Sequence, residues 1–460
     1  MYEYGQTDVG EINSGKLTFH QGATCQREAL PNSGLTCLSK LEPAELSGCF
    51  SGLRAEYEKV KGENLRLDMS RGKPCPQQLD LALGMLACVD KDHYKSPTGV
   101  DCRNYGGVDG LPEVKELFAP ILGVRPEEII IGGNSSLNMM HDTIARAMLF
   151  GVVDGEVPWG RLPVVKFLCP SPGYDRHFAL CEFFGIQMIT VEMTERGPDM
   201  DEVEKLVAAD ETIKGIWCVP RYSNPTGITY SAETVERLAR MRTKAPDFRI
   251  FWDNAYVVHH LTSAPEPLKN ILEACAEAGH PERVFIFTST SKISFSGAGL
   301  AMLAASARNI ARIRKELAFQ TIGPDKINQL RHLLFFRDPA GIEAHMKKHA
   351  AIIAPKFELV LEMLRTELAG VATWNEPKGG YFINFNTMEG CAKRVVELAA
   401  EAGVILTPAG ATYPYGKDPL DRNIRLAPTF PDLPELKRAM EVFVLCVKLA
   451  TVEKLLKTRS

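Results

Sequence analysis

Residues 283–292 read RVFIFTSTSK, an apolar run followed at once by hydroxyl side chains and a lysine. The run has the length and apolar character of a buried strand. Lys292 would then stand at the carboxyl end of that strand, with Gly297 and Gly299 following it. Burial near apolar walls or other cations lowers the pKa of a lysine amine and makes it a nucleophile for a carbonyl group. Taken alone, a Ser-Lys pair in a loop is more often a solvated turn.

Apolar runs and helical stretches alternate along the chain before this segment. Such an alternation predicts an α/β fold with a mainly parallel sheet, and these sheets bind ligands at the carboxyl ends of their strands. The predicted strands are 129–131, 164–168, 187–191, 215–219, 249–252 and 283–288, and the predicted helices are 112–122, 137–150, 199–209 and 232–243.

The pattern changes after Asp338, where a smaller α+β unit is expected. A long helix over 341–369, interrupted only by Pro355, leads into it. At the other end of the chain, residues 44–61 form an amphipathic pattern, and Pro43 suits a helix start. The first forty residues show no period and predict an arm or a partly disordered leader. The elements expected in the α+β unit are strands 381–386, 404–406 and 423–426 and helices 390–402 and 433–457.

Composition narrows the class of protein. A chain of 460 residues is long enough for two or three domains. Its 53 basic and 57 acidic residues give a net charge of −4, which argues against nucleic-acid binding. The 12 cysteines are too few for a disulfide scaffold, and no CxxC or HExxH predicts a metal site. The uncharged stretch 293–307 falls short of the ~20 apolar residues of a membrane span. With no secretory signal either, we expect a cytoplasmic protein without membrane contact.

Three further segments follow predicted strands. Asp253, in FWDNAY (251–256), is either a helix N-cap or a buried carboxylate that keeps a pyridine nitrogen protonated. The segment SNPTG (223–227) is simply a turn when it stands alone. The segment GGNSS (132–136) precedes a predicted helix, where free backbone N–H groups and the helix dipole can hold an anion. A purely capping role fits that last segment equally well.

In this order, the four segments resemble the fold-type-I pyridoxal-phosphate enzymes, and specifically the class I aminotransferases. The resemblance extends from about Leu65 to Pro428. It implies a large domain with a mainly parallel seven-stranded sheet flanked by helices, and a smaller α+β domain. It assigns residues 1–75 to the arm and part of the small domain, 76–344 to the large cofactor-binding domain and 345–460 to the small domain. It also implies pyridoxal 5′-phosphate as cofactor and a homodimer.

By this resemblance Lys292 would bind the cofactor covalently as a Schiff base and then move the substrate Cα proton. Asp253 would pair with the pyridinium nitrogen. Asn224 and Tyr256 would hydrogen-bond the phenolic oxygen of the cofactor, and Tyr174 would stack on its ring.

Other family positions match residues around the phosphate and the ring. His177 falls where the family places a partner of the pyridinium aspartate, although a structural histidine is the simpler interpretation of that residue alone. Tyr105, in NYGGVDGL (104–111), matches a tyrosine that reaches the phosphate of the neighbouring subunit. The residues that match the phosphate cup are Asn134, Ser135, Ser136 and Ser289.

Substrate contacts are also implied. Arg425, in NIRLA (423–427), matches the arginine that binds the substrate α-carboxylate, a bidentate grip that lysine cannot reproduce. The alternative is a surface arginine on a strand. Asn224 would lie beside this carboxylate. Gly72, in SRGKP (70–74), lies where family members close a loop over the substrate.

One position departs from the family pattern. Family members carry an arginine seven or eight residues after the lysine to bind the phosphate, but Gly299 and Leu300 stand here. Another cation should compensate for it. We hypothesise that Lys326 does so from the partner subunit, the alternative being a solvated lysine at a helix start.

This departure, together with SRGKP, YSNPTG and the string IGPDKINQLRH (322–332), resembles a subgroup of aspartate aminotransferases. The subgroup is related to the aminotransferase-like domain of certain transcriptional regulators. It implies L-aspartate and 2-oxoglutarate as substrates in a ping-pong cycle. No motif identifies the residue that binds a distal carboxylate, for which Arg71, Lys73 and Lys326 are candidates.

Other functions stay open at this stage. A broad aromatic or aminoadipate transaminase, or a lyase, would use the same cofactor. A non-catalytic ligand sensor is less favoured, since only about forty residues precede the first predicted helix and they contain no basic helix-turn-helix pattern.

Overall fold

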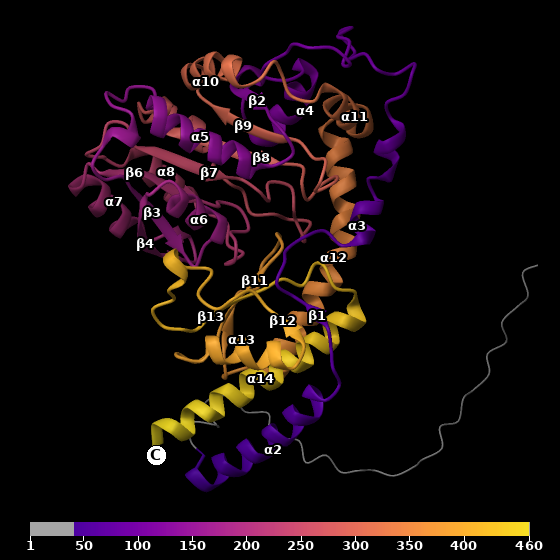
Figure 1. The fold of residues 1–460 in the computed structure, drawn as a ribbon, viewed down its shortest axis with the longest axis vertical. Coiled ribbons are helices and arrows are strands. Elements are labelled where there is room, and N and C mark those ends of the chain that lie inside the picture. Colours follow the sequence, from indigo (N-terminus) through magenta and orange to yellow (C-terminus); the bar gives the residue numbers. More distant parts are fainter. Residues whose placement is uncertain (1–40, 460) are drawn as a thin grey trace, which may run out of the picture. The chain divides into compact units, whose positions relative to one another are not determined.

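The largest sheet of the computed structural model, which describes residues 41–459, has eight strands (Figure 1). Its strand order is β2-β9-β8-β7-β6-β3-β4-β5. In that order the strands span Ile129–Ile131, Ala301–Ala305, Val284–Ser289, Arg249–Asp253, Ile213–Cys218, Lys166–Ser171, Gln187–Thr194 and Gly197–Pro198.

The centre of the sheet is parallel. Neighbouring strands from β8 through β7, β6 and β3 to β4 all pair in parallel, whereas β9 runs antiparallel to both of its neighbours. This arrangement confirms the predicted α/β fold with a mainly parallel sheet. The sheet has eight strands, whereas the resemblance implied seven. The additional strand, β5, is two residues long and pairs only with the end of β4. So short a strand leaves no recognisable pattern in the sequence.

Helices cover both faces of this sheet, and residues alternate between the two along each strand. In β7, Ile250 and Trp252 belong to one apolar cluster and Phe251 to the other. Strands buried on both faces are typical of parallel sheets. The first cluster is completed by α4 (Pro112–Leu122), α7 (Met200–Ala209), α8 (Ala232–Arg240), α9 (Ile271–Glu277) and α11 (Lys326–Phe336), and the second by α5 (Ser136–Phe150), α6 (Asp175–Phe183) and α10 (Ala307–Gln320).

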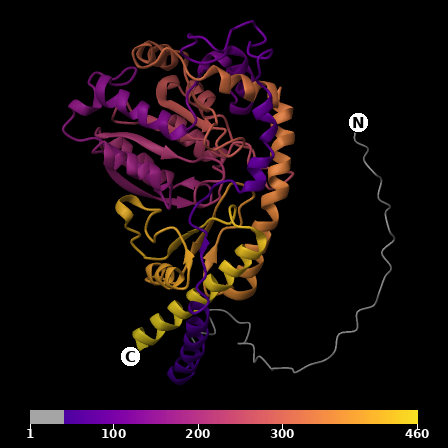
Figure 2. The ribbon, with the colours of Figure 1, turned by 45° about the vertical axis from the view of Figure 1, so that its right-hand side comes forward.

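A separate apolar cluster joins the two ends of the described chain. In this cluster α2 (Pro43–Lys61) packs along α14 (Leu433–Arg459), and in both views the two helices lie side by side (Figures 1 and 2). β1 (Leu67–Asp68) pairs in parallel with β12 (Val404–Ile405), which brings the two ends together again. The other elements of this part are α12 (Pro339–Leu368), α13 (Ala392–Glu401) and the sheet β10-β11-β13, with bounds Thr373–Trp374, Ile383–Asn386 and Asn423–Leu426.

Most predicted elements agree with this structure to within a few residues, but besides the five-residue α3 (Pro76–Asp80) four helices were not predicted as elements: α6, α9, α10 and α11. The first two are short, with nine and seven residues. α10 is largely polar and follows β9, a strand hidden in the stretch 293–307 that shows no period. The arm predicted over residues 1–40 lies outside the described residues, and the predicted domain limits at 75 and 344 remain a prediction. No helix between residues 41 and 459 is long and apolar enough to cross a membrane.

Candidate active site

A cavity of about 610 Å³ lies at the carboxyl ends of the parallel strands. Because β6, β7 and β8 are parallel neighbours, the residues that follow them meet at one edge of the sheet. β13 and the turn after β1 supply the opposite wall. The predicted site residues that line this cavity are Gly72, Ser136, Tyr174, Asn224, Asp253, Tyr256, Ser289, Lys292 and Arg425.

Lys292 presents its amine to the cavity from the loop that follows β8. Its Nζ lies 5.3 Å from the ring centre of Tyr256 and 5.9 Å from that of Tyr381. Desolvation by these walls lowers the pKa of the amine, and the charge of Asp253 opposes this only in part. The loop is held by its backbone, since His345 contacts the carbonyl of Ile293 at 2.8 Å. Lys292 can therefore act as a neutral amine, as a nucleophile or base requires.

Asp253 is the last residue of β7 and is only 2% exposed. Its Oδ2 lies 3.0 Å from Nε2 of His177, whose ring stacks on Trp217 at 4.2 Å. Its Oδ1 is buried and has no hydrogen-bond partner within residues 41–459. A buried carboxylate oxygen without a partner is costly. The cavity therefore presents one strong acceptor that a ligand N–H group could satisfy.

Arg425, on β13, points at the same cavity from the opposite wall. Its Nη1 lies 2.9 Å from Oδ1 of Asp175 and 3.3 Å from Oδ1 of Asn224. Its Cζ lies 4.8 Å from the ring centre of Phe382, and its buried Nε has no partner among the described residues. The guanidinium is thus held in one plane and keeps donor capacity for a further anion.

Two tyrosines line the cavity as neutral phenols. Burial raises the pKa of Tyr174 and of Tyr256, and the nearby charge of Asp253 adds to both shifts. Each hydroxyl therefore keeps its proton at neutral pH and can donate a hydrogen bond. The ring of Tyr174 meets that of His177 edge-on, with 4.9 Å between the centres.

Hydroxyl groups gather at the N-terminus of α5. The N-cap Ser135 accepts a hydrogen bond from the Leu137 N–H. Ser289 and Ser291 lie within 2.9 Å of each other, and Ser291 donates to the Asn134 carbonyl. The neighbouring Gly133 and Gly297 have open space where a side chain would begin. A 15-residue helix, free space and several hydroxyl donors together suit a phosphate group.

The absence of the arginine that binds the phosphate in other family members has a steric reason. A Cβ at Gly299 would lie 2.9 Å from Oγ1 of Thr290 and 3.2 Å from the Ser291 nitrogen. Leu300 is buried, and its N–H donates to Thr290 Oγ1. This tight loop therefore leaves no room for a long side chain at position 299.

Four of the predicted cofactor residues do not line the cavity of their own chain: Asn134 and Ser135, described above, and Tyr105 and Lys326. Tyr105 is 82% exposed, and Lys326 is only 5% exposed and donates from Nζ to the Gly106 carbonyl at 2.6 Å. Neither lines the cavity. The cofactor contacts predicted for Tyr105 and Lys326 would therefore require the site of a second subunit.

Three residues at the site escaped the sequence-based prediction. Asp175 and Arg176 directly follow the predicted Tyr174, so their position in the sequence could have drawn attention to them. Phe382 packs against the backbone of Gly72, where an added Cβ would lie 2.2 Å from its Cζ. No sequence pattern joins Gly72 and Phe382, since they meet only in the folded chain.

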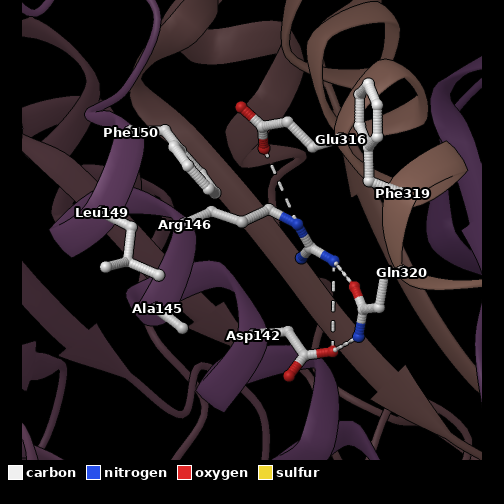
Figure 3. A pocket seen from close by; sticks show the side chains of 8 residues that line it. All are labelled: Asp142, Ala145, Arg146, Leu149, Phe150, Glu316, Phe319 and Gln320. Atoms are coloured by element: carbon white, nitrogen blue, oxygen red, sulfur yellow. Dashed lines mark hydrogen bonds and ion pairs between the residues drawn. The ribbon is translucent and has the colours of Figure 1, made fainter.

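A second cavity, of about 630 Å³, lies between α5 and α10 (Figure 3). Arg146 is its only cation among the described lining residues, and it contacts Glu316 at 3.6 Å and Gln320 at 2.5 Å. Its rim carries apolar side chains, including Phe319, which is 95% exposed. The described lining residues include no Ser, Thr, Cys, His or Lys, so this cavity is a poor candidate for chemistry.

The mainly parallel sheet, the lysine after β8 and the carboxylate at the end of β7 define an aminotransferase of fold type I, a class whose members use pyridoxal 5′-phosphate. A family model described as "Aspartate amino-transferase" matches residues 41–459, and the chain belongs to that family. This confirms the family that the four motifs indicated.

Known relatives agree with this assignment. The chain is 51% identical over 404 residues to a "Putative aminotransferase" of Mycolicibacterium smegmatis, covering 87% of this chain and 94% of the relative. It is 47% identical over 413 residues to an "Aspartate aminotransferase" of Corynebacterium glutamicum, covering 89% and 95%. A crystal structure of an aspartate transaminase from Corynebacterium glutamicum has a TM-score of 0.89 at 45% identity and covers 92% of this chain and 100% of that one.

Proposed function

We propose that this protein is a pyridoxal-phosphate-dependent aminotransferase that moves an amino group from L-aspartate to 2-oxoglutarate in a ping-pong cycle. The observation that carries the proposal is the buried Oδ1 of Asp253, which has no partner among the described residues and lines the same cavity as Lys292 and Arg425. The name of the 47% identical relative supports aspartate as the donor.

The residues fit the cofactor. Asp253 Oδ1 would accept the pyridinium N–H, and Tyr174 would lie against the ring. Asn224 and Tyr256 would contact the phenolic oxygen, since both line the cavity near Lys292. The phosphate would be held by the N-terminus of α5 with Asn134, Ser135, Ser136 and Ser289. When bound, pyridoxal phosphate supplies an electron sink that stabilises negative charge at the substrate Cα.

The protein's own residues bind, orient and move a proton. Arg425 would bind the α-carboxylate of the substrate through its free Nε side, with Asn224 beside it. This grip would present the Cα–H bond to Nζ of Lys292. Burial lowers the pKa of this amine and so favours the neutral form, which would accept the Cα proton. His177 would keep Asp253 oriented.

We infer that the working unit is a homodimer in the cytoplasm. Tyr105 is exposed and so suits a role in the site of a second subunit, whereas the buried Lys326 donates to the neighbouring Gly106 carbonyl and holds the loop that carries Tyr105. The exposed apolar rim of the second cavity, which includes Phe319, supports burial against another chain (Figure 3). The small and large domains, 1–75 with 345–460 and 76–344, would close over the substrate at Gly72.

The test is cofactor loading and amino transfer by the purified holoenzyme. Reduction with borohydride should fix the cofactor to the wild-type chain, as read by mass spectrometry, and a Lys292→Ala variant should lose this adduct. Lys378, exposed and paired with Glu266 at 2.7 Å, provides the control in Lys378→Ala. If the adduct forms equally in Lys292→Ala, the assigned lysine is wrong. If wild-type holoenzyme forms no oxaloacetate from aspartate and 2-oxoglutarate, the substrate assignment is wrong.

A further inference from the structure

The carbonyl group next to Lys292 is held by a histidine of the long helix α12. Nε2 of His345 lies 2.8 Å from the Ile293 carbonyl oxygen, and the histidine side chain is only 5% exposed. A carbonyl oxygen can only accept a hydrogen bond, so this nitrogen must carry the proton of the ring. Burial lowers the pKa of His345, so the ring is neutral near pH 7. Its single N–H group is therefore committed to the loop that carries Lys292.

A line of buried polar side chains leads from His345 to the wall of the catalytic cavity. His349, one turn further along α12, places its Nε2 3.0 Å from Nε2 of His345. The side-chain amide of Gln78 lies 3.0 Å from Nδ1 of His349 and 2.9 Å from the hydroxyl oxygen of Tyr381. His349, Gln78 and Tyr381 are at most 1% exposed, so water does not compete for these contacts.

The far end of this line faces the amine of Lys292. The ring centre of Tyr381 lies 5.9 Å from Nζ, and the same ring stacks on Tyr256 with 6.0 Å between the centres. Gln78 fixes the hydroxyl of Tyr381, while His345 fixes the backbone beside Lys292. One connected set of side chains thus holds both the loop that presents the amine and the ring that lies against it.

Polar side chains are a costly way to fill this space. Apolar side chains of similar volume would pack there without the cost of removing polar groups from water. Hydrogen bonds, in contrast, fix distances and directions that apolar contacts leave free. A fixed direction matters for Nζ of Lys292, because a displacement of about 1 Å at a reacting group can cost roughly 100-fold in rate.

We propose that His345, supported by His349 and Gln78, is a positioning residue for Lys292. Through the Ile293 carbonyl it would hold the loop so that Nζ points at the carbonyl carbon of the cofactor and at the Cα–H bond of the substrate. The inference rests on the proposed function, which assigns these tasks to Lys292. Neither histidine contacts Arg425 or Asp253, so the grip on the substrate carboxylate does not depend on them.

The experiment compares two polar substitutions that differ in reach. In His345→Gln the amide nitrogen can take the place of Nε2, whereas in His345→Asn it falls about one carbon short of the Ile293 carbonyl. His345→Asn holoenzyme should lower kcat for aspartate roughly 10- to 100-fold and change KM by less than about threefold. His345→Gln should retain at least about a third of the wild-type kcat. The control is His280→Asn, an exposed histidine outside the cavity lining, which should change neither quantity.

A spectroscopic measurement separates positioning from a loss of folded protein. The pH at which the absorbance of the cofactor held by Lys292 changes reports the surroundings of that nitrogen. His345→Asn should shift this midpoint, and His345→Gln should keep it. A purely structural defect would lower the amount of bound cofactor and leave the midpoint where it is. If His345→Asn does not fold, His349→Leu takes its place and should give the same shift and the same fall in kcat, both smaller.

Three outcomes would overturn the inference. Equal losses in His345→Gln and His345→Asn would show that the imidazole acts by packing and not through its N–H group. A raised KM with an unchanged kcat would place its effect on substrate binding. A wild-type midpoint and kcat in both His345→Asn and His349→Leu would show that the line of side chains does not reach Lys292. In each of these cases an active wild type leaves the proposed function standing, whereas a wild type that neither binds pyridoxal phosphate nor transaminates aspartate contradicts that function itself.

Discussion

The guanidinium of Arg425 and the carboxylate of Asp175 form an ion pair, with 2.9 Å between Nη1 and Oδ1. The pair joins β13 to the first turn of α6 across 250 positions of sequence. Since Asp175 occupies one end of the guanidinium and Phe382 lies against its face, only the remaining edge is available to a ligand. The ion pair thus fixes the direction from which a carboxylate can approach.

The first prediction concerns this edge. Arg425→Lys replaces a planar donor pair with a point charge, so the substrate carboxylate loses its bidentate contact. We expect kcat/KM for aspartate to fall roughly 100-fold, mainly through KM. Steady-state kinetics would measure this, with retained cofactor absorbance as the control for folding. A variant with unchanged KM would argue against the assignment of Arg425.

The second prediction concerns the acceptor at the end of β7. Asp253→Asn keeps the shape but removes the charge that would hold a pyridinium proton, so we expect the turnover rate to fall by roughly three orders of magnitude or more. His177→Gln should have a smaller effect, because it removes only the residue that orients Asp253. Single-turnover kinetics with aspartate would rank the two variants. The reverse ranking would make His177, and not Asp253, the principal residue.

The third prediction concerns the close approach of Gly72 to Phe382. The Cβ of a Gly72→Ala variant would lie 2.2 Å from Cζ of Phe382, so this ring, which lies against Arg425, must shift. We expect KM for aspartate to rise roughly 10-fold while the melting temperature changes little. Gly52→Ala on α2, where nothing lies within 4 Å, is the matched control and should alter neither quantity strongly. An unchanged KM in Gly72→Ala would show that the ring of Phe382 does not constrain the substrate.

How much of the structure could be predicted from the sequence differs between parts of the chain. The strands before Lys292, the helix 112–122 and the strand 423–426 were predictable because their apolar patterns are long or clearly bounded. Strand β9 was not predictable, because Gly297 and Gly299 interrupt the apolar pattern before it. The pairing of Asp175 with Arg425 was equally inaccessible, since it depends on how β13 meets α6.

The fourth prediction is the pH dependence of stability. Burial lowers the pKa of His332 to about 4 and that of His349 to about 3, from an ordinary value of 6.5. Between pH 6.5 and those values the unfolded chain binds protons that the folded chain excludes. The free energy of unfolding should therefore be fully retained above pH 6.5 and fall as the pH drops toward 4. Urea denaturation over this range would measure the slope.

A pair of variants isolates the contribution of His332. His332→Gln removes the titrating ring and should flatten the slope below pH 6.5. Ser294→Ala removes only a hydrogen-bond partner, 2.8 Å from Nε2, and should lower stability while most of the slope remains. If both variants give the wild-type slope, other groups cause the acid sensitivity.

The fifth prediction tests the inferred subunit interface. Phe319→Glu places a charge on the exposed apolar rim of the second cavity, so we expect the dimer to dissociate at concentrations where wild type stays paired. Analytical ultracentrifugation would report the masses. Leu433, exposed at the start of α14, is the control in Leu433→Glu and should leave the dimer intact. A dimer that tolerates Phe319→Glu would locate the interface elsewhere.

The core shared by α2 and α14 bears on how the chain is made. Leu46 and Tyr57 pack in one apolar cluster with Val442 and Phe443, which leave the ribosome near the end of synthesis. The elements of the large sheet are all translated by residue 305, so they can assemble first. α2 must then wait, with its apolar side uncovered, until the last helix appears. A premature stop before residue 433 would accordingly leave α2 without its partner, and such truncated chains should be targets for chaperones and proteases.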